Sequence, residues 1–179
     1  MIGQEELIDL CKRGNTMAYT QLYHQHSRAV YNTILRLIEH TAEAEDVLQE
    51  SFVVAFQKIE GYKNTGGFRA WVKRIAINKS IERLRKRKIR LVELEPEYSL
   101  EEEVMDEEAF EFTMSKVNTA IEALPEGYRV IFILFAIENL PHTEIAQMLG
   151  MENGAVRTKY HRAKHKLLSS LKEEGYHER

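Results

Sequence analysis

The sequence has only one cysteine and no long apolar run, and each of these two shortages excludes a class of protein. Cys11 has no second thiol in the chain to pair with, which excludes a disulfide-stapled secreted scaffold and fits a reducing compartment. No stretch approaches the roughly 18 consecutive apolar residues that a membrane-spanning helix needs. Residues 1–10 lack the pattern of a signal peptide. We therefore expect a cytoplasmic protein that is not embedded in a membrane.

Residue sets for metal or catalytic chemistry are also missing. His161 and His165, four residues apart, could share a metal, but no carboxylate or third ligand lies nearby in sequence. A catalytic zinc ion needs three protein ligands. Cys11, His24 and His26 are distant in sequence and could join such a site only through folding. Because no nucleophile, base and orienting group stand in a recognisable set, we expect no enzymatic activity, no metal and no cofactor.

The charges are separated into blocks although the net charge is only -3. Residues 69–90 hold ten Lys and Arg against one acid, and residues 154–172 hold six against none. Between them, residues 93–111 hold ten acids and no base. Separated blocks of opposite sign matter more for partners than their sum. The pattern predicts two segments suited to nucleic acid and an acidic connector that weakens DNA binding by the free protein.

Apolar residues recur at three- and four-residue spacing, which predicts helices over most of the chain. In the first part we expect helices over 4–13, 16–40 and 42–60, a loop at 61–67 and a long basic helix from 68. In the second part we expect a helix from about 113, a break at 125–127, and helices over 130–137, after Pro141, and from about 153 to 171.

The fold class that follows is all-α, with two small helical domains. We place the first at 1–91 and the second at 113–175. Residues 92–112 are too acidic to bury much apolar surface, so we expect them to form a linker.

Residues 143–163 have the pattern of a helix-turn-helix. Gly150 lies where the sharp turn favours a residue without a Cβ atom, and we expect Asn153 to cap the second helix. The apolar stripe of that helix comprises Val156, Tyr160, Ala163, Leu167 and Leu171. The opposite face offers Arg157 for a bidentate guanine contact and several lysines for phosphates. Alone, the same pattern also fits the solvated basic face of an amphipathic helix.

Two features of the first domain need a partner. The helix from residue 68 combines cations with aromatic residues at its start, which suits single-stranded DNA. On 42–60, a second stripe places two apolar residues, Val53 and Phe56, on an otherwise polar face. Such a face is typical of a covered surface. Alternatively, Phe56 belongs to a small core.

Three motifs, in this order, resemble the sigma-70 family of RNA polymerase sigma factors, in particular its extracytoplasmic-function group. Asp46-Val-Leu-Gln-Glu-Ser-Phe52 resembles the polymerase-binding helix of that group. Phe68-Arg-Ala-Trp-Val-Lys-Arg-Ile-Ala-Ile-Asn78 and its basic tail resemble the helix that melts and recognises the −10 element. Leu124-Pro-Glu-Gly-Tyr-Arg129 with the helix-turn-helix resembles the −35 reader.

The resemblance implies three sets of binding residues. The polymerase-binding set is Asp46, Gln49, Glu50, Val53 and Phe56. The −10 set is Tyr62, Lys63, Asn64, Phe68, Trp71, Lys73, Arg74, Asn78, Lys79, Arg83 and Arg85, of which Trp71 also fits a place in the core. The −35 set is Arg157, Thr158, Lys159, His161, Arg162, Lys164 and Lys166.

The resemblance also implies the partners. These are the bacterial RNA polymerase core, promoter DNA (a duplex −35 element and a single-stranded −10 element) and an anti-sigma factor, without an obligate homo-oligomer. The main alternative is a conventional helix-turn-helix regulator that acts on duplex DNA. That alternative leaves the basic helix from residue 68 and the partner face of 42–60 unexplained, and a non-DNA adaptor leaves both basic blocks unexplained.

Overall fold

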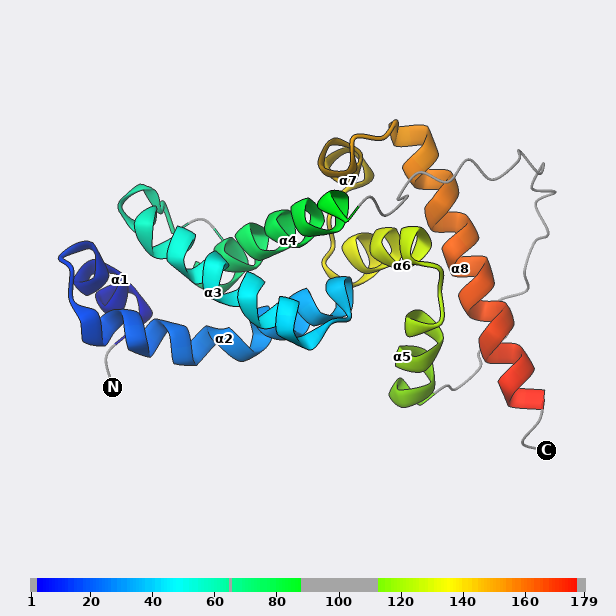
Figure 1. Ribbon diagram of the computed structural model, residues 1–179, viewed down its shortest axis with the longest axis horizontal. Helices are drawn as coiled ribbons and strands as arrows, with labels where there is room; N and C mark the ends of the chain where they lie inside the picture. The colour runs from blue at the N-terminus through cyan, green and yellow to red at the C-terminus, as the bar shows by residue number, and fades with distance from the viewer. Residues whose placement is uncertain (1–2, 65, 88–112, 177–179) are drawn as a thin grey trace. The chain divides into compact units, whose positions relative to one another are not determined.

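The computed structural model describes residues 3–64, 66–87 and 113–176. Contacts divide the chain into two units, and each is described by itself (Figure 1). Every regular element in the described residues is a helix, so the predicted all-α fold class is confirmed. The predicted linker, residues 92–112, lies outside the described residues. The structure therefore does not bear on the expectation that this acidic segment weakens DNA binding by the free protein.

The first unit is a bundle of three long helices with a short helix packed at one end (Figure 1). Its elements are α1 (Gln4–Lys12), α2 (Thr16–Ile38), α3 (Thr41–Gln57), the 3₁₀ turn η1 (Ile59–Gly61) and α4 (Phe68–Lys86). α2, α3 and α4 all pack on one another, whereas α1 packs on α2 and on η1. The helix expected over 42–60 ends at Gln57, because the chain tightens there into η1.

The core of this bundle consists of apolar residues at three- and four-residue spacing on each long helix. Fully buried members are Leu22, Val30, Ile34 and Leu37 from α2, Ala44, Val47 and Ala55 from α3, and Phe68, Val72, Ala76 and Leu84 from α4. Each large aliphatic side chain contributes about 1.5–3 kcal/mol when it leaves water. The loop before α4 reverses the chain through Gly66 and Gly67, both at φ 84°, where a residue with a Cβ atom would be strained.

In its described residues, 113–176, the second unit contains four helices and one π-helical turn. Its elements are α5 (Met114–Glu122), α6 (Glu126–Phe132), η2 (Ile133–Ile137), α7 (His142–Leu149) and α8 (Asn153–Tyr176). α6, α7 and α5 all pack on α8. The final helix extends past the predicted end at residue 171.

The expected break at 125–127 is wrong in part, since Glu126 and Gly127 belong to α6. The reason is that the carbonyl of Pro125 accepts hydrogen bonds from the amides of Tyr128 and Arg129, each 2.9 Å long, and so starts the helix. A proline before the first helical position loses no donor that the helix needs. The break itself is confined to residues 123–125.

The side chain of Arg129 in α6 bonds back to the end of α5 and to the break between the two helices. Its side chain is only 6% exposed. One guanidinium nitrogen, Nη1, donates to the carbonyl of Leu124 at 3.0 Å and to that of Glu122 at 3.4 Å. Glu122 is the last residue of α5, where helical acceptors lack intrahelical partners, and Leu124 lies in the break that follows. Arg129 therefore ties α5 to α6 and is a structural residue.

Candidate nucleic-acid and polymerase interface

The helix-turn-helix prediction is confirmed in its geometry. α7 ends at Leu149, and Gly150, which follows it, has φ 65° and ψ 37°. The amide of Met151 donates to the carbonyl of Ala146 (2.9 Å) and that of Gly150 to the carbonyl of Gln147 (3.4 Å). This pair of bonds is a Schellman motif, and its left-handed position favours glycine. The turn thereby sets the start of α8 directly after α7.

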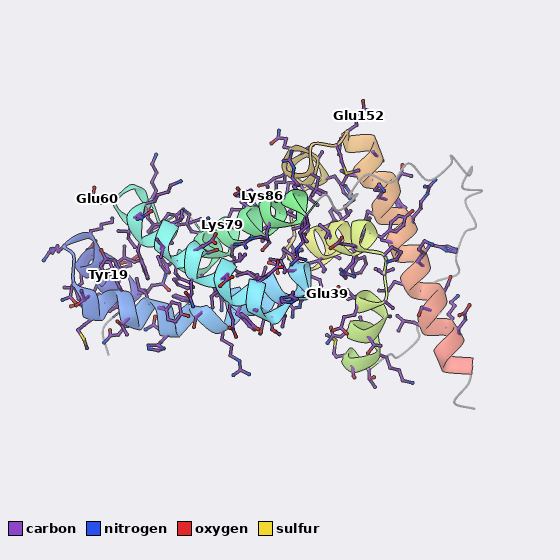
Figure 2. The ribbon with its side chains drawn as sticks, viewed as in Figure 1. Tyr19, Glu39, Glu60, Lys79, Lys86 and Glu152 are labelled. Carbon is purple, nitrogen blue, oxygen red and sulfur yellow. The ribbon has the colours of Figure 1, made fainter. Side chains whose placement is uncertain are left out.

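α8 begins one residue earlier than its predicted cap implied. The amide of Val156 donates to the carbonyl of Glu152 at 3.1 Å, so Glu152 and not Asn153 occupies the cap position. Glu152 lies at the top of α8 in Figure 2. Asn153 is instead the first residue of α8, one position past the cap.

The two faces of α8 divide as predicted. Val156, Ala163, Leu167 and Leu171 are buried, whereas Tyr160 is only half-buried. Arg157, Thr158 and His161 are exposed on the outer face, together with Lys164. A helix that reads base edges in the major groove needs such a row of exposed donors near its N-terminus.

Two lysines of the −35 set lie against an aromatic ring. The Nζ atoms of Lys159 and Lys166 lie 5.2 Å and 5.7 Å from the centroid of the Tyr128 ring. This is a cation–π geometry, so the ring holds both ammonium groups on the side of α8 that faces α6. These two cations line the flank of the helix and fit phosphates better than base edges.

Three stacked or tilted rings, from Phe135, His142 and Tyr160, pack together beside the N-terminal half of α8. The His142 ring stacks on Phe135 with centroids 4.0 Å apart, and Tyr160 lies 4.5 Å from Phe135. Burial, and then the nearby charge of Arg157 and of His161, lowers the pKa of His142. A neutral His142 therefore stays in this stack at pH 7 and adds no positive charge beside Arg157.

α4 carries the cations of the −10 set along its length, and Figure 2 labels two lysines on it, Lys79 and Lys86. Asn78 and Arg85 are exposed, while Lys73, Arg74, Lys79 and Arg83 are partly exposed. On the loop before α4, Lys63 and Asn64 are exposed. The structure therefore places most polar members of this set where a nucleic-acid strand could reach them.

Two aromatic members of the −10 set need correction. Phe68 is 0% and Tyr62 6% exposed, so neither ring offers a free face to a base. Both lie in an aromatic cluster with neighbouring centroids 4.8–6.3 Å apart, formed by Tyr19, Tyr23, Phe52, Phe56, Tyr62, Phe68 and Trp71. Trp71 is half-buried and packs on Tyr62 at 4.9 Å. The buried rings of this cluster pack beneath the loop before α4 and are not accessible for stacking on DNA bases.

The polymerase-binding set lies on α3 and divides in two. Asp46, Gln49 and Val53 are exposed, Val53 to 54%, and share the outer face. Phe56 is half-buried and turns into the aromatic cluster, with its ring 4.8 Å from that of Tyr19. Val53 is therefore an exposed apolar residue on a polar face, as expected for a partner surface. Phe56 instead packs mainly within the aromatic cluster.

Glu50 pairs with α4, which the sequence did not reveal. Its Oε2 atom lies 3.3 Å from Nζ of Lys79 and its Oε1 atom 2.8 Å from Nη2 of Arg83. A second pair joins Glu43 of α3 to Arg87 at the end of α4. Acids of α3 thus neutralise part of the basic row of α4. Salt bridges between helices depend on their packing and leave no signal in a single sequence.

None of the described helices is long and apolar enough to span a membrane. In the same part of the chain, no group of three or more His, Cys, Asp or Glu residues is placed to hold a metal ion. Burial raises the pKa of the Cys11 thiol to about 11, so it is protonated at neutral pH.

Comparison with known proteins identifies both units. Residues 22–89 match the family described as Sigma-70 region 2, and residues 114–167 match Sigma-70, region 4. The ECF RNA polymerase sigma factor SigW of Bacillus subtilis is 27% identical, over 90% of this chain and 93% of that protein. RNA polymerase sigma factor SigV of the same organism is 30% identical, over 77% of this chain and 81% of that protein.

A solved structure has a similar fold. It is the sigma factor RpoE of Bartonella quintana in complex with the anti-sigma factor NepR, with a TM-score of 0.54 at 19% identity over 86% of this chain and 96% of that chain. The two matched regions occur in one chain and in order, which a conventional helix-turn-helix regulator does not explain. The class is therefore a promoter-specificity subunit of RNA polymerase. Within it, the chain belongs to the sigma-70 family, extracytoplasmic-function group.

Proposed function

We propose that this sigma factor binds the polymerase core through the exposed face of α3 and reads a promoter with its two units. The observation that carries the proposal is the combination, in one chain, of the basic row on α4 with the exposed donor row on α8. The first is suited to an unpaired strand and the second to the major groove. No chemical step is required of this chain, since capture of unpaired bases shifts the equilibrium towards the open duplex.

Each surface has a distinct part in this mechanism. Asp46, Gln49 and Val53 dock on the core enzyme. The loop 61–67, with Lys63 and Asn64, receives a base of the −10 element, and the exposed Asn78 lies on the helix that follows. The cations of α4 (Lys73, Arg74, Lys79, Arg83 and Arg85) follow the strand.

The second unit reads the −35 element in duplex form. Arg157, Thr158 and His161 face base edges, while Lys159, Arg162, Lys164 and Lys166 contact phosphates on either side. Binding of both units to one polymerase raises the effective concentration of each promoter element for its reader. Two individually weak readers then select a promoter together.

The test is transcription by purified bacterial core polymerase, with and without this protein, on a library with randomised promoters. We expect run-off products whose templates share two spaced upstream elements. Arg157→Ala should relax selection at one position of the upstream element only. Absence of initiation and of core binding, together with tight binding to a palindrome without core, would contradict the proposal.

We also propose that an anti-sigma factor sequesters this protein in the cytoplasm. Support comes from the fold shared with the RpoE structure, which was solved as a complex with an anti-sigma factor. The exposed face of α3, with Val53 at its centre, is a surface that such a partner can cover in competition with the core. A co-purifying protein that blocks transcription and leaves when core is added would support this, and one that binds together with core would oppose it.

A further inference from the structure

The loop before α4 is held from the N-terminal helix by a chain of two hydrogen bonds. The hydroxyl of Tyr62 donates to Oδ1 of Asn64 at 3.0 Å. Nδ2 of Asn64 donates in turn to Oε1 of Glu5, which lies 59 residues away in sequence, at 2.9 Å. Glu5 stands in the first turn of α1. A side chain of α1 therefore sets the orientation of an amide on the loop.

The backbone of Asn64 has a left-handed conformation. Its φ angle is 53°, in the left-handed region that asparagine enters more readily than other residues with a side chain. Residues 62–64 follow directly on η1, which packs on α1. The two bonds use one amide hydrogen and one carbonyl lone pair of Asn64, so one of each remains for a base edge.

Tyr62 and α1, which stand at the two ends of this pair of hydrogen bonds, are both packed against their neighbours. Tyr62 is buried against Phe68 and Trp71, and burial, followed by the charge of Glu5, raises the pKa of its phenol, so the hydroxyl remains a donor. α1 is fixed through buried residues Leu7, Ile8 and Cys11. The hydroxyl of Tyr19 on α2 also donates to the carbonyl of Cys11 at 2.7 Å. Figure 2 labels Tyr19 at this junction.

We infer that Glu5 is a positioning residue for −10 recognition: it holds Asn64 so that the remaining donor and acceptor of the amide face the captured base. This rests on the proposed function, in which the loop 61–67 receives that base. Glu5 lies outside the segment 22–89 that matches Sigma-70 region 2, so the matched region does not include the group that orients its loop. α1 thereby becomes part of the promoter-reading apparatus without touching DNA.

The experiment measures base preference at every −10 and −35 position with core polymerase and the randomised promoter library. The Glu5→Ala variant removes the acceptor for Asn64, whereas Glu5→Gln keeps an acceptor oxygen and removes only the charge. Glu6→Ala is the matched control, because Glu6 is an exposed acid in the same turn. Asn64→Ala marks the promoter position that the amide reads.

We expect Glu5→Ala to lower the preference by about three- to tenfold, the effect of one ordinary hydrogen bond, at the position that Asn64→Ala also affects. The −35 preferences and the melting temperature should be unchanged. Glu5→Gln and Glu6→Ala should retain the native −10 preference.

Three outcomes would overturn the inference. An unaltered −10 preference in Glu5→Ala, with Asn64→Ala altered, leaves the proposed function intact and removes Glu5 from it. An equal change in Glu5→Ala and Glu5→Gln assigns the effect to charge and not to positioning. Failure of the native protein to direct initiation removes the proposed function and this inference with it.

Discussion

Neutralising Glu50 should strengthen DNA binding by the free protein even though it weakens the fold. Glu50 of α3 contacts Lys79 through one carboxylate oxygen and Arg83 through the other. Glu50→Gln keeps the size of the side chain and one acceptor oxygen, but it removes the charge that holds both cations. Lys79 and Arg83 then face a DNA strand without the competing charge of Glu50.

The size of the effect follows from the exposure of the three groups. The side chains of Glu50, Lys79 and Arg83 are 48%, 24% and 32% exposed, so each ion pair is a surface pair worth about 0.2–1 kcal/mol. We expect the free energy of unfolding to fall by about 0.5–1 kcal/mol. The affinity for single-stranded DNA should rise by about two- to fivefold, since the same pairs no longer compete with phosphates.

The salt dependence gives the sharper test. If both released cations neutralise one phosphate each, the slope of log K against log salt should steepen by about 1.4. The measurement is filter binding of a radiolabelled single-stranded oligonucleotide over a series of salt concentrations. Glu45→Gln is the matched control, because Glu45 is an exposed acid on the same helix and the substitution removes the same charge. Identical slopes for Glu50→Gln and Glu45→Gln would refute the reasoning.

Three further predictions concern stability and reactivity. Arg129→Ala should destabilise the second unit by about 2–3 kcal/mol, because the carbonyls of Glu122 and Leu124 lose a charged hydrogen-bond donor. Amide hydrogen exchange in α5 measures this. Exchange no faster than in Lys164→Ala, a control at an exposed site, would contradict the prediction. Burial and then the charge of Arg69 lower the pKa of His26 in the folded protein. As the pH falls, His26 is therefore protonated in the unfolded state before it is protonated in the folded state. Its contribution to the free energy of unfolding is complete above about pH 6.5 and should decline below that value. Urea midpoints at pH 7.5 and 5.5 should differ less in His26→Gln than in the native protein or in His24→Gln, and an unchanged difference would count against this assignment. The Cys11 thiol, with its pKa of about 11, should react roughly 100-fold more slowly at pH 8 than a thiol at the ordinary value of 9.0, and fast labelling of the native protein would disprove its burial.

The helical layout and the exposed basic faces of α4 and α8 could be predicted from the sequence because both depend on periodicity. The stripe on α8 and the glycine of the turn need only residue spacing and backbone preference. The end of α3 and the start of α6 could not be placed as well. Their boundaries depend on single hydrogen bonds, such as those accepted by the Pro125 carbonyl, which compete closely with alternatives.

The candidate sites were predicted less completely, since residue type does not reveal which neighbour a side chain meets. Phe68 and Tyr62 have the composition of a stacking platform, yet tertiary packing buries both rings. Glu50 was assigned to polymerase binding from its motif, but α4 supplies its partners. Glu5 gave no signal, because its contact with Asn64 spans most of the first unit in sequence.

The buried thiol also makes the chain convenient for spectroscopy. Cys11 is 1% exposed, so we expect the native protein to react with maleimide dyes as slowly as a chain without cysteine. Met17 and Met114 are 67% and 74% exposed and belong to different units. With Met17→Cys and Met114→Cys in one chain, a donor and an acceptor dye can be attached without first removing Cys11. Energy transfer between them would then follow, in single molecules, how the spacing of the two units changes as core polymerase and promoter are added in turn.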